Sequence, residues 1–262
     1  MPRPAVSIRN VGKTWEIDGR PPLRAIDGLS FDVAPGEFVV LLGPSGCGKS
    51  SLLYMIAGLE KVSSGVIEDD GIPISGPSPE RGLIFQEASL YPWLTILDNV
   101  AFGLAVRAEM PARRKEMATA ILRRVGLGDV LDKKPDELSG GMRQRAACAR
   151  ALVMQPRVLM MDEPFAALDV QTRAKLQDFL LQIWRDSRAS ILLVTHSIDE
   201  AISLADRVIV FTARPGRVKE IVPIDLPRPR ATRSPRYHEY RDYFTELLAA
   251  EVDKAFAEQQ MI

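Results

Sequence analysis

A glycine-rich stretch supplies the first residues whose types and spacing indicate chemistry. Residues 43–50 read Gly-Pro-Ser-Gly-Cys-Gly-Lys-Ser, after an apolar run at 39–42 and before an amphipathic segment at 51–57. Glycines allow backbone N–H groups to approach a phosphate closely, and the N-terminus of the following helix adds positive potential. The sequence therefore predicts a phosphate-binding loop. Its predicted contributors are Gly43, Pro44, Ser45, Gly46, Cys47, Gly48, Lys49, Ser50 and Ser51.

Two side chains of this loop carry further chemistry. Lys49 supplies a positive charge to the β- and γ-phosphates of a nucleotide, and the Ser50 hydroxyl is a ligand for Mg²⁺. A turn that is merely rich in glycine is the alternative, but strand, loop and helix follow one another as a P-loop requires. A P-loop alone also fits a kinase, a GTPase or a motor protein, so a second group of residues must decide.

The loop also contains Cys47, one of two cysteines in the chain. The surrounding glycines and helix N-terminus provide positive potential, which favours the thiolate. We therefore expect a maleimide to label Cys47 first, and bound nucleotide to protect it. Cys148 falls within a predicted helix, where a buried apolar role is expected. Two cysteines do not indicate a disulfide scaffold, so a reducing cytoplasm is the default compartment.

A second apolar run, at 158–161, ends in the acids Asp162 and Glu163. Carboxylates at the tip of a buried strand are costly unless they are solvated or bind a cation. Asp162 is the natural partner of Mg²⁺, usually through water, and Glu163 can polarise the attacking water. The alternative is an acidic turn at the surface, which the phosphate loop upstream makes less attractive.

The run Leu-Ser-Gly-Gly-Met-Arg-Gln-Arg at 138–145 forms another anion site, because Ser139 caps a helix whose first turn carries glycines. This run resembles the signature of the ABC ATPases, which other P-loop families lack. In that family the signature faces the γ-phosphate bound by a second subunit. The resemblance therefore implies ATP as the nucleotide, and contacts from Ser139 and Gly141 across a dimer.

Four further positions match the same family. Gln86 resembles the glutamine that senses Mg²⁺ and communicates with the membrane subunit, and His196 resembles the switch histidine at the γ-phosphate. Asp169 resembles the aspartate at the dimer interface, and Trp15 occupies the place of the aromatic residue that stacks on adenine. With these the resemblance implies three catalytic residues, Glu163, His196 and Gln86. It also implies three metal ligands, Ser50, Gln86 and Asp162.

Finer features resemble one group within the family. Residues 86–100, and above all the run Pro-Trp-Leu-Thr at 92–95, are similar to the ATPases of nitrate, sulfonate and taurine importers, as are 213–217 and 226–230. The apolar residues at 90–93 predict a surface groove for a partner's helix, or else an internally packed loop. Nitrate, taurine, alkanesulfonates, bicarbonate and aromatic or pyrimidine compounds all remain open as the substrate.

This resemblance implies several partners. They are a second ATPase subunit, in a homodimer or a heterodimer, transmembrane permease subunits and, indirectly, a solute-binding protein. An exporter or lipid-transport ATPase shares the same chemistry and stays as an alternative. A soluble ABC ATPase is disfavoured, because such proteins usually carry two cassettes or a long coiled-coil insertion.

The composition agrees with a peripheral subunit. Of 262 residues 46% are hydrophobic and 26% charged, and 34 basic residues balance 34 acidic ones, so nothing indicates a nucleic-acid partner. No apolar run approaches the roughly 18–20 residues that span a bilayer, and residues 1–4 lack the apolar core of a signal peptide. The expected location is the cytoplasmic face of the cell membrane, reached through the permease subunits.

The elements that position these residues follow from the apolar pattern. Segments at 5–11, 29–33 and 37–42, separated by Pro21-Pro22 and by the turn at 34–36, predict an antiparallel layer. From Phe38 the pattern is continuously apolar, as in a buried parallel sheet, and this character returns at 158–161, 191–194 and 208–211. Another strand is expected at 218–224. Helices are expected at 97–104, 112–125, 140–152 and 170–188.

The predicted fold class is therefore α/β. It has the parallel-sheet core of a P-loop NTPase of the ABC ATPase type, an antiparallel β subdomain and an inserted helical subdomain at about 95–152. The ATPase domain is expected to span 1–230 and a helical tail 231–262. An apolar face at 240, 244, 247, 248 and 252 predicts that the tail docks on its own domain rather than on a partner.

Overall fold

A computed structural model describes residues 3–259 of the chain. It divides into two compact units. The first unit comprises the residues up to Pro77 together with those from Ser190 onward, and the second comprises Ser78 to Ala189. The helical subdomain expected at 95–152 lies within the second unit. The last three residues of the expected tail, and the first two of the chain, lie outside the described range.

The first unit contains an antiparallel sheet in the order β2-β1-β4-β5. Its strands are β1 (Val6–Ile17), β2 (Arg20–Val33), β4 (Ser64–Asp69) and β5 (Ile72–Pro73). The turn predicted at Pro21-Pro22 is wrong, since both prolines lie inside β2. The prolines are tolerated because β2 is an edge strand. The sequence pattern also missed β4 and β5.

The same unit holds a second group of strands in the order β10-β9-β3-β8. These are β3 (Phe38–Leu42), β8 (Ser190–Thr195), β9 (Arg207–Phe211) and β10 (Val218–Pro223). β3 pairs in parallel with both β8 and β9, so the segment at 37–42 does not belong to the antiparallel layer. Every residue of β3 and β8 is buried, which explains their continuous apolar sequences.

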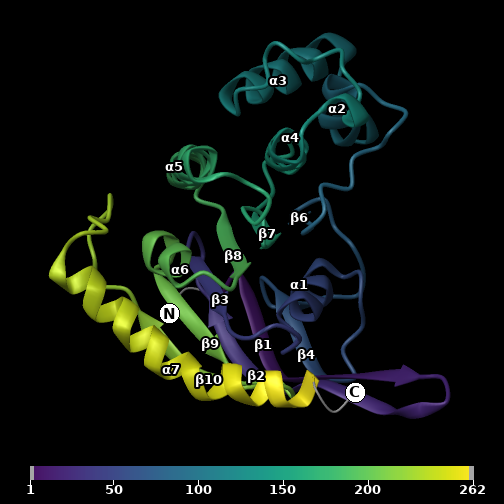
Figure 1. Cartoon of the computed structure of the whole chain (residues 1–262). Helices are drawn as coiled ribbons and strands as arrows, with labels where there is room; N and C mark the ends of the chain where they lie inside the picture. Colours follow the sequence, from purple (N-terminus) through teal and green to yellow (C-terminus); the bar gives the residue numbers. More distant parts are fainter. Residues whose placement is uncertain (1–2, 260–262) are drawn as a thin grey trace. The chain divides into compact units, whose positions relative to one another are not determined.

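Three helices complete the first unit: α1 (Lys49–Ala57), α6 (Ile198–Leu204) and α7 (Pro235–Gln259). Figure 1 draws α7 in yellow beside β10, and the Tyr240 hydroxyl donates to the Pro223 carbonyl at 3.2 Å. Phe244 and Leu248 are buried on this face, so the tail packs on its own unit as predicted. Val252 is 51% exposed, however, and its predicted place on the docked face is wrong. The buried position there belongs to Glu251.

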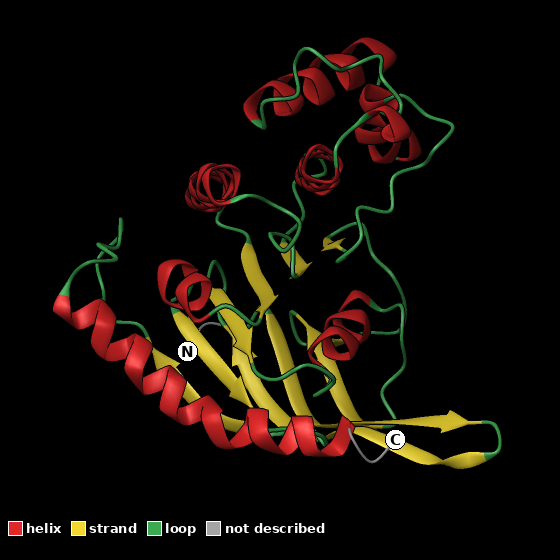
Figure 2. Cartoon of the chain, viewed as in Figure 1, coloured by secondary structure: helices red, strands yellow, loops and turns green. Residues whose placement is uncertain are grey.

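The second unit combines a short parallel strand pair with helices, which Figure 2 colours yellow and red. The strands are β6 (Arg81–Ile84) and β7 (Val158–Asp162). The helices are α2 (Ile96–Val106), α3 (Pro111–Arg124), the 3-10 turn η1 (Pro135–Glu137), α4 (Gly140–Leu152) and α5 (Val170–Ser187). α4 packs on β6, α2 and α3. Across residues 3–259, the helices are all too short or too polar to cross a membrane.

Candidate functional site

The glycine-rich loop connects the buried strand β3 to α1, as predicted. Gly48 is the N-cap of α1 and has φ 95°, and Gly46 has φ 77°, both in the region that favours glycine. A Cβ on Gly48 would also lie 2.6 Å from Ile26 Cγ1 of β2. The loop conformation therefore requires glycine on two grounds, backbone geometry and close packing.

Lys49, the first residue of α1, is buried and turns back into the loop. Its Nζ donates to the carbonyl oxygens of Gly43 at 2.9 Å and Pro44 at 2.7 Å, and to Cys47 Sγ at 3.5 Å. An ammonium group has three donors, and these three contacts match that number. A phosphate that contacts Lys49 must therefore exchange with at least one of these loop contacts.

Cys47 does not match the prediction of a readily ionised thiol. Its side chain is 1% exposed, and this burial raises the pKa of Cys47 by more than the neighbouring Lys49 ammonium and its hydrogen bonds lower it. The expected thiolate is therefore wrong, because the loop folds its thiol inward. Cys148 in α4 is buried as predicted, and burial raises its pKa to about 12.

His196 lies at the same sheet edge as the phosphate loop. Leu42 of β3 pairs with Thr195 of β8, so the loop and the histidine both begin directly after these partners. The His196 side chain is exposed. Two hydrogen bonds stabilise the turn that carries His196. Thr195 Oγ1 donates to the buried Glu200 at 2.6 Å and accepts the Ser197 N–H at 3.0 Å. Ligands of parallel sheets bind at this carboxyl edge.

Trp15 is half-buried on β1 of the same unit, beside a lysine that the sequence analysis missed. Lys13 Nζ lies 4.0 Å from the centroid of the Trp15 ring, a cation–π contact. The same ammonium donates to Glu60 Oε2 at 3.1 Å and to the Lys61 carbonyl at 2.9 Å. The period-2 spacing of Lys13 and Trp15 places both on one face of the strand, which is the signal that could have linked them.

In the second unit, too, candidate residues stand at the ends of paired parallel strands, and here they include the acids. Ile84 of β6 pairs with Met161 of β7, so Gln86 and the pair Asp162–Glu163 follow neighbouring parallel strands. Asp162 is 1% exposed, whereas Gln86 is exposed. Glu163 has φ 46°, a left-handed conformation that costs a non-glycine residue about 1–3 kcal/mol.

Ser139, Gly141 and Asp169 lie at two helix starts of the second unit. Ser139 caps α4 by accepting the Met142 N–H at 3.3 Å. A Cβ on Gly141 would lie 3.2 Å from Leu168 Cδ2, so the signature helix packs closely on the segment before α5. Asp169 caps α5, and hydrogen bonds from Thr172, first from its side chain and then from its backbone, hold the pKa of this carboxyl below its usual range.

The segment after Gln86 is held by two residues that the sequence analysis did not single out. The buried Asn99 accepts the Tyr91 N–H at 2.8 Å and donates to the carbonyls of Tyr91, Leu94 and Thr95 at 2.9–3.2 Å. Arg150 of α4 donates to the Ser89 carbonyl at 2.8 Å. A polar residue at a buried helical position was the available signal for Asn99.

An exposed aromatic patch lies over this segment. The Tyr91 ring lies 5.5 Å from Trp93 and 4.8 Å from Phe102, measured between centroids. Trp93 is 69% exposed, and Phe102, Val106 and Met110 are exposed as well. The loop is therefore anchored through its backbone. Tyr91 is half-buried, and Trp93 is the large side chain of the loop that faces solvent.

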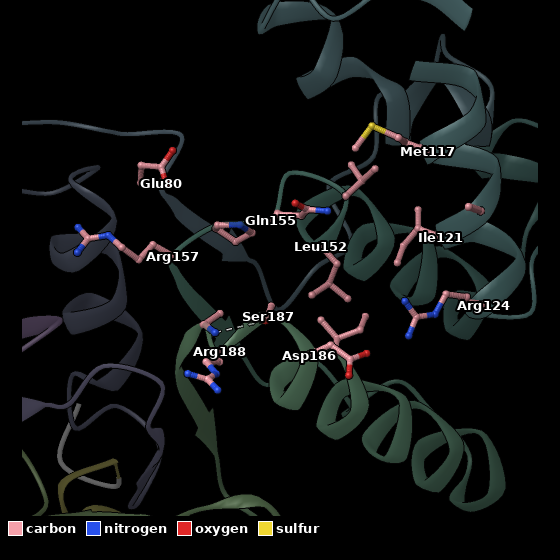
Figure 3. Close-up of a pocket in the computed structure, with 15 residues that line it drawn as sticks. Glu80, Met117, Ile121, Arg124, Leu152, Gln155, Arg157, Asp186, Ser187 and Arg188 are labelled. Carbon is pink, nitrogen blue, oxygen red and sulfur yellow. Dashed lines mark hydrogen bonds between the residues drawn. The ribbon is translucent and has the colours of Figure 1, made fainter. Parts of the chain in front are cut away.

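A pocket of about 630 Å³ lies elsewhere in the second unit, and Figure 3 shows its lining. Met117 and Ile121 of α3, Leu152 of α4, and Asp186 and Arg188 at the end of α5 contribute to it. None of its lining residues is a predicted nucleotide ligand. The candidate ligands of each unit are therefore the strand ends and helix starts described above, and not the residues of this pocket.

Comparison with known proteins decides the family. The family described as "ABC transporter" matches residues 26–166, which is more than half of the chain. The chain belongs to the ABC transporter family. Two solved dimeric structures of an ABC transporter cassette resemble it with TM-scores of 0.77 and 0.78 and 31% identity, over 84% of this chain and 98% of the cassette. One of them is described as a post-hydrolysis state bound to ADP and Pi.

Curated relatives of this ABC ATPase cover nearly its whole length. An uncharacterised ABC transporter ATP-binding protein of Methanocaldococcus jannaschii is 46% identical, over 95% of this chain and 93% of that protein. The nitrate transport protein NasD of Klebsiella oxytoca is 42% identical, over 97% of this chain and 99% of NasD. The bicarbonate transport ATP-binding protein CmpC of Synechococcus elongatus is 41% identical over 89% of this chain, but this match spans only 36% of CmpC.

These findings confirm the resemblance, the fold class and the ATPase activity predicted from the sequence. The chain is an ABC ATPase subunit that binds nucleotide. The roles of individual residues stay predictions.

Proposed function

We propose that this ABC ATPase powers the import of a small anion, such as nitrate, bicarbonate or a sulfonate. The observation that carries the proposal is the match to NasD, a nitrate transport protein of almost the same length. The partial match to CmpC, a bicarbonate transport protein, supports the same substrate class. Such a subunit supplies the energy, and the permease and a solute-binding protein select the solute.

The phosphates of ATP are assigned to the loop and to α1. Backbone N–H groups of 45–51 surround them, Lys49 exchanges its loop contacts for phosphate oxygens, and the positive end of α1 adds to the attraction. Adenine stacks on Trp15. The indole is half-buried, and the Lys13 ammonium lies over its ring.

The residues present fit a magnesium ion shared with ATP. Mg²⁺ prefers oxygen ligands and is usually bound through one or two carboxylates together with substrate phosphates. The hydroxyl of Ser50, the amide of Gln86 and the carboxylate of Asp162 are donors of this kind. Within residues 3–259 no three His, Cys, Asp or Glu side chains group into a metal site of their own. When bound, the ion neutralises charge on the phosphates.

Hydrolysis requires a group that orients and deprotonates water. Glu163 is assigned this role, because it follows the buried Asp162 at the end of β7 and its unusual backbone conformation directs it away from a regular strand. His196 and Gln86 stand at corresponding strand ends and are assigned to the γ-phosphate and to the metal ion.

A second copy of the chain completes the site. Ser139 and Asp169 are exposed, and Val170, which follows Asp169, is 80% exposed. Both solved cassettes described above are dimers. We assign Ser139 and Gly141 to the nucleotide of the partner copy.

The permease subunit is assigned to the aromatic patch of Tyr91, Trp93 and Phe102. Aromatic side chains are enriched in protein interfaces, and an apolar groove receives an amphipathic helix. Through this contact the ATPase lies at the cytoplasmic face of the cell membrane. Replacement of Trp93 by Ala should leave the ATPase rate of the isolated subunit unchanged and weaken assembly with the permease.

The proposal is tested with the complete transporter in vesicles that contain the permease. The solute-binding protein should be loaded in turn with nitrate, bicarbonate, taurine or an alkanesulfonate, and the ATPase rate measured for each. One anion should stimulate hydrolysis and accumulate at the expense of ATP. Outward movement of the solute, or stimulation by lipid alone, would identify an exporter instead.

A further inference from the structure

The turn between β9 and β10 forms a support beneath the phosphate loop. At its centre Gly216 donates its N–H to the Ala25 carbonyl at 2.8 Å and accepts the Asp27 N–H at 3.0 Å. A Cβ on Gly216 would lie 2.0 Å from the Cys47 carbonyl oxygen. The backbone of the turn therefore lies directly against the backbone of the loop, with no room for a side chain between them.

A second contact of the same kind lies at the other end of the loop. A Cβ on Gly43 would lie 2.9 Å from the Cβ of Phe211, the last residue of β9. Phe211 is fully buried. The end of β9 and the turn at 212–217 thus contact the phosphate loop in two places, at Gly43 and at Cys47. A displacement of this support would displace the loop.

The support is fastened to the C-terminal helix by Glu251. This carboxylate is 4% exposed. One oxygen accepts the N–H of Ala213 in the turn at 2.8 Å, and the other accepts from Lys219 Nζ of β10 at 2.9 Å. Lys219 also donates to the Leu247 carbonyl of α7 at 2.8 Å. One buried acid therefore joins the helix, the strand and the turn.

The charge and the hydrogen bonds of Glu251 make this residue hard to replace. Burial by itself would raise the pKa of Glu251, but hydrogen bonds from Lys219 and from the Ala213 N–H outweigh it and hold the pKa below its usual range. The carboxylate is thus ionised at neutral pH. Without it, the buried Ala213 N–H would lose its acceptor, which is costly, and the partly exposed Lys219 would keep only the Leu247 carbonyl.

We propose that Glu251 is a positioning residue of the nucleotide site, which acts through Ala213 and Gly216 on the backbone of the phosphate loop. The inference rests on the proposed role of that loop in binding ATP. It gives the C-terminal helix a function in the ATPase cycle beyond covering its own unit. Because the backbone N–H groups of the loop hold the phosphates, a loosened support weakens nucleotide affinity more than it slows the chemical step at Glu163.

Two substitutions of Glu251 separate its hydrogen bond with the Ala213 N–H from its ion pair with Lys219. Glu251→Gln keeps an oxygen for the Ala213 N–H and loses the charge toward Lys219, whereas Glu251→Met removes both. We expect the Kd of Mg-ATP and its KM to rise about 10-fold in Glu251→Met, with a smaller rise in Glu251→Gln and a change in kcat of less than about 2-fold. Glu246→Met, at an exposed position of the same helix, is the matched control.

The measurement is binding of a fluorescent ATP analogue by the full chain, with thermal unfolding and steady-state kinetics recorded alongside. An unchanged Kd and KM in both Glu251 variants, whatever their unfolding temperatures, would overturn the inference. If Glu251→Met does not fold, Glu251→Gln decides by the same criterion. Lys49→Ala tests the loop itself. Normal ATP binding by Lys49→Ala would refute the proposed site, whereas its loss together with normal Glu251 variants would refute only the positioning role.

Discussion

Leu42 of β3 and Thr195 of β8 are direct partners in a parallel register, so the phosphate loop and His196 leave the sheet at the same level. In the second unit Ile84 and Met161 stand in the same relation ahead of Gln86 and Glu163. Each unit thus presents its functional residues at the carboxyl ends of paired strands. This arrangement places polar residues at strand ends without breaking the buried, hydrogen-bonded part of either strand.

ATP should drive the protein into a dimer. In Glu163→Gln, which should trap ATP, light scattering is expected to show a dimer with ATP and a monomer with ADP. Adding Val170→Asp places a charge on the exposed apolar position beside Asp169 and should abolish the dimer. The control substitution Gln182→Asp, at an exposed position of the same helix, should leave the dimer intact. A monomer at saturating ATP, with activity independent of protein concentration, would speak against the shared site.

Cys47 should react more slowly than an ordinary exposed thiol at pH 7. Its raised pKa leaves less thiolate at neutral pH, so labelling should keep accelerating as the pH rises beyond the range where ordinary thiols are already ionised. Cys148, with a pKa of about 12, should be slower still. Mass spectrometry after timed exposure to a maleimide measures both rates. Fast labelling of Cys47 in the folded protein would show that the thiol is not held inward.

Asn99 should be essential to the stability of the second unit. Asn99→Leu is expected to act on folding, because it removes the side-chain acceptor of the Tyr91 N–H and the amide that donates to the carbonyls of Tyr91, Leu94 and Thr95. The free energy of unfolding should fall by about 1–3 kcal/mol. Urea unfolding followed by circular dichroism measures this change, with Gln182→Leu as the control. Equal stability of the two variants would rule out this role.

Much of the fold was predictable because its signals are local. Continuous apolar runs identified β3, β7, β8 and β9, and the Ser139 cap before two glycines gave the start of α4 where the structure has it. The candidate ligands were predictable for the same reason, since glycines, lysine and acids follow strands within a few residues.

The remainder depends on contacts between distant parts of the chain. Glu251 and Ala213 are 38 residues apart, and nothing near Glu251 in the sequence marks it as a buried acid. The pKa of Cys47 depends on how the loop folds, because burial and the nearby ammonium act in opposite directions. Pro21 and Pro22 indicate a turn unless the strand is known to lie at a sheet edge. These features become visible only once tertiary packing is known.

The central claim, that Glu163 activates water for hydrolysis of ATP held by the loop, is tested most directly by one variant. Purified Glu163→Gln should bind Mg-ATP with near-normal affinity and hydrolyse it at least about 100-fold more slowly, because water activation is lost while the phosphate contacts remain. Lys49→Ala should instead lose affinity. Single-turnover hydrolysis at saturating Mg-ATP gives the answer. A rate near that of the unmodified protein would contradict the account.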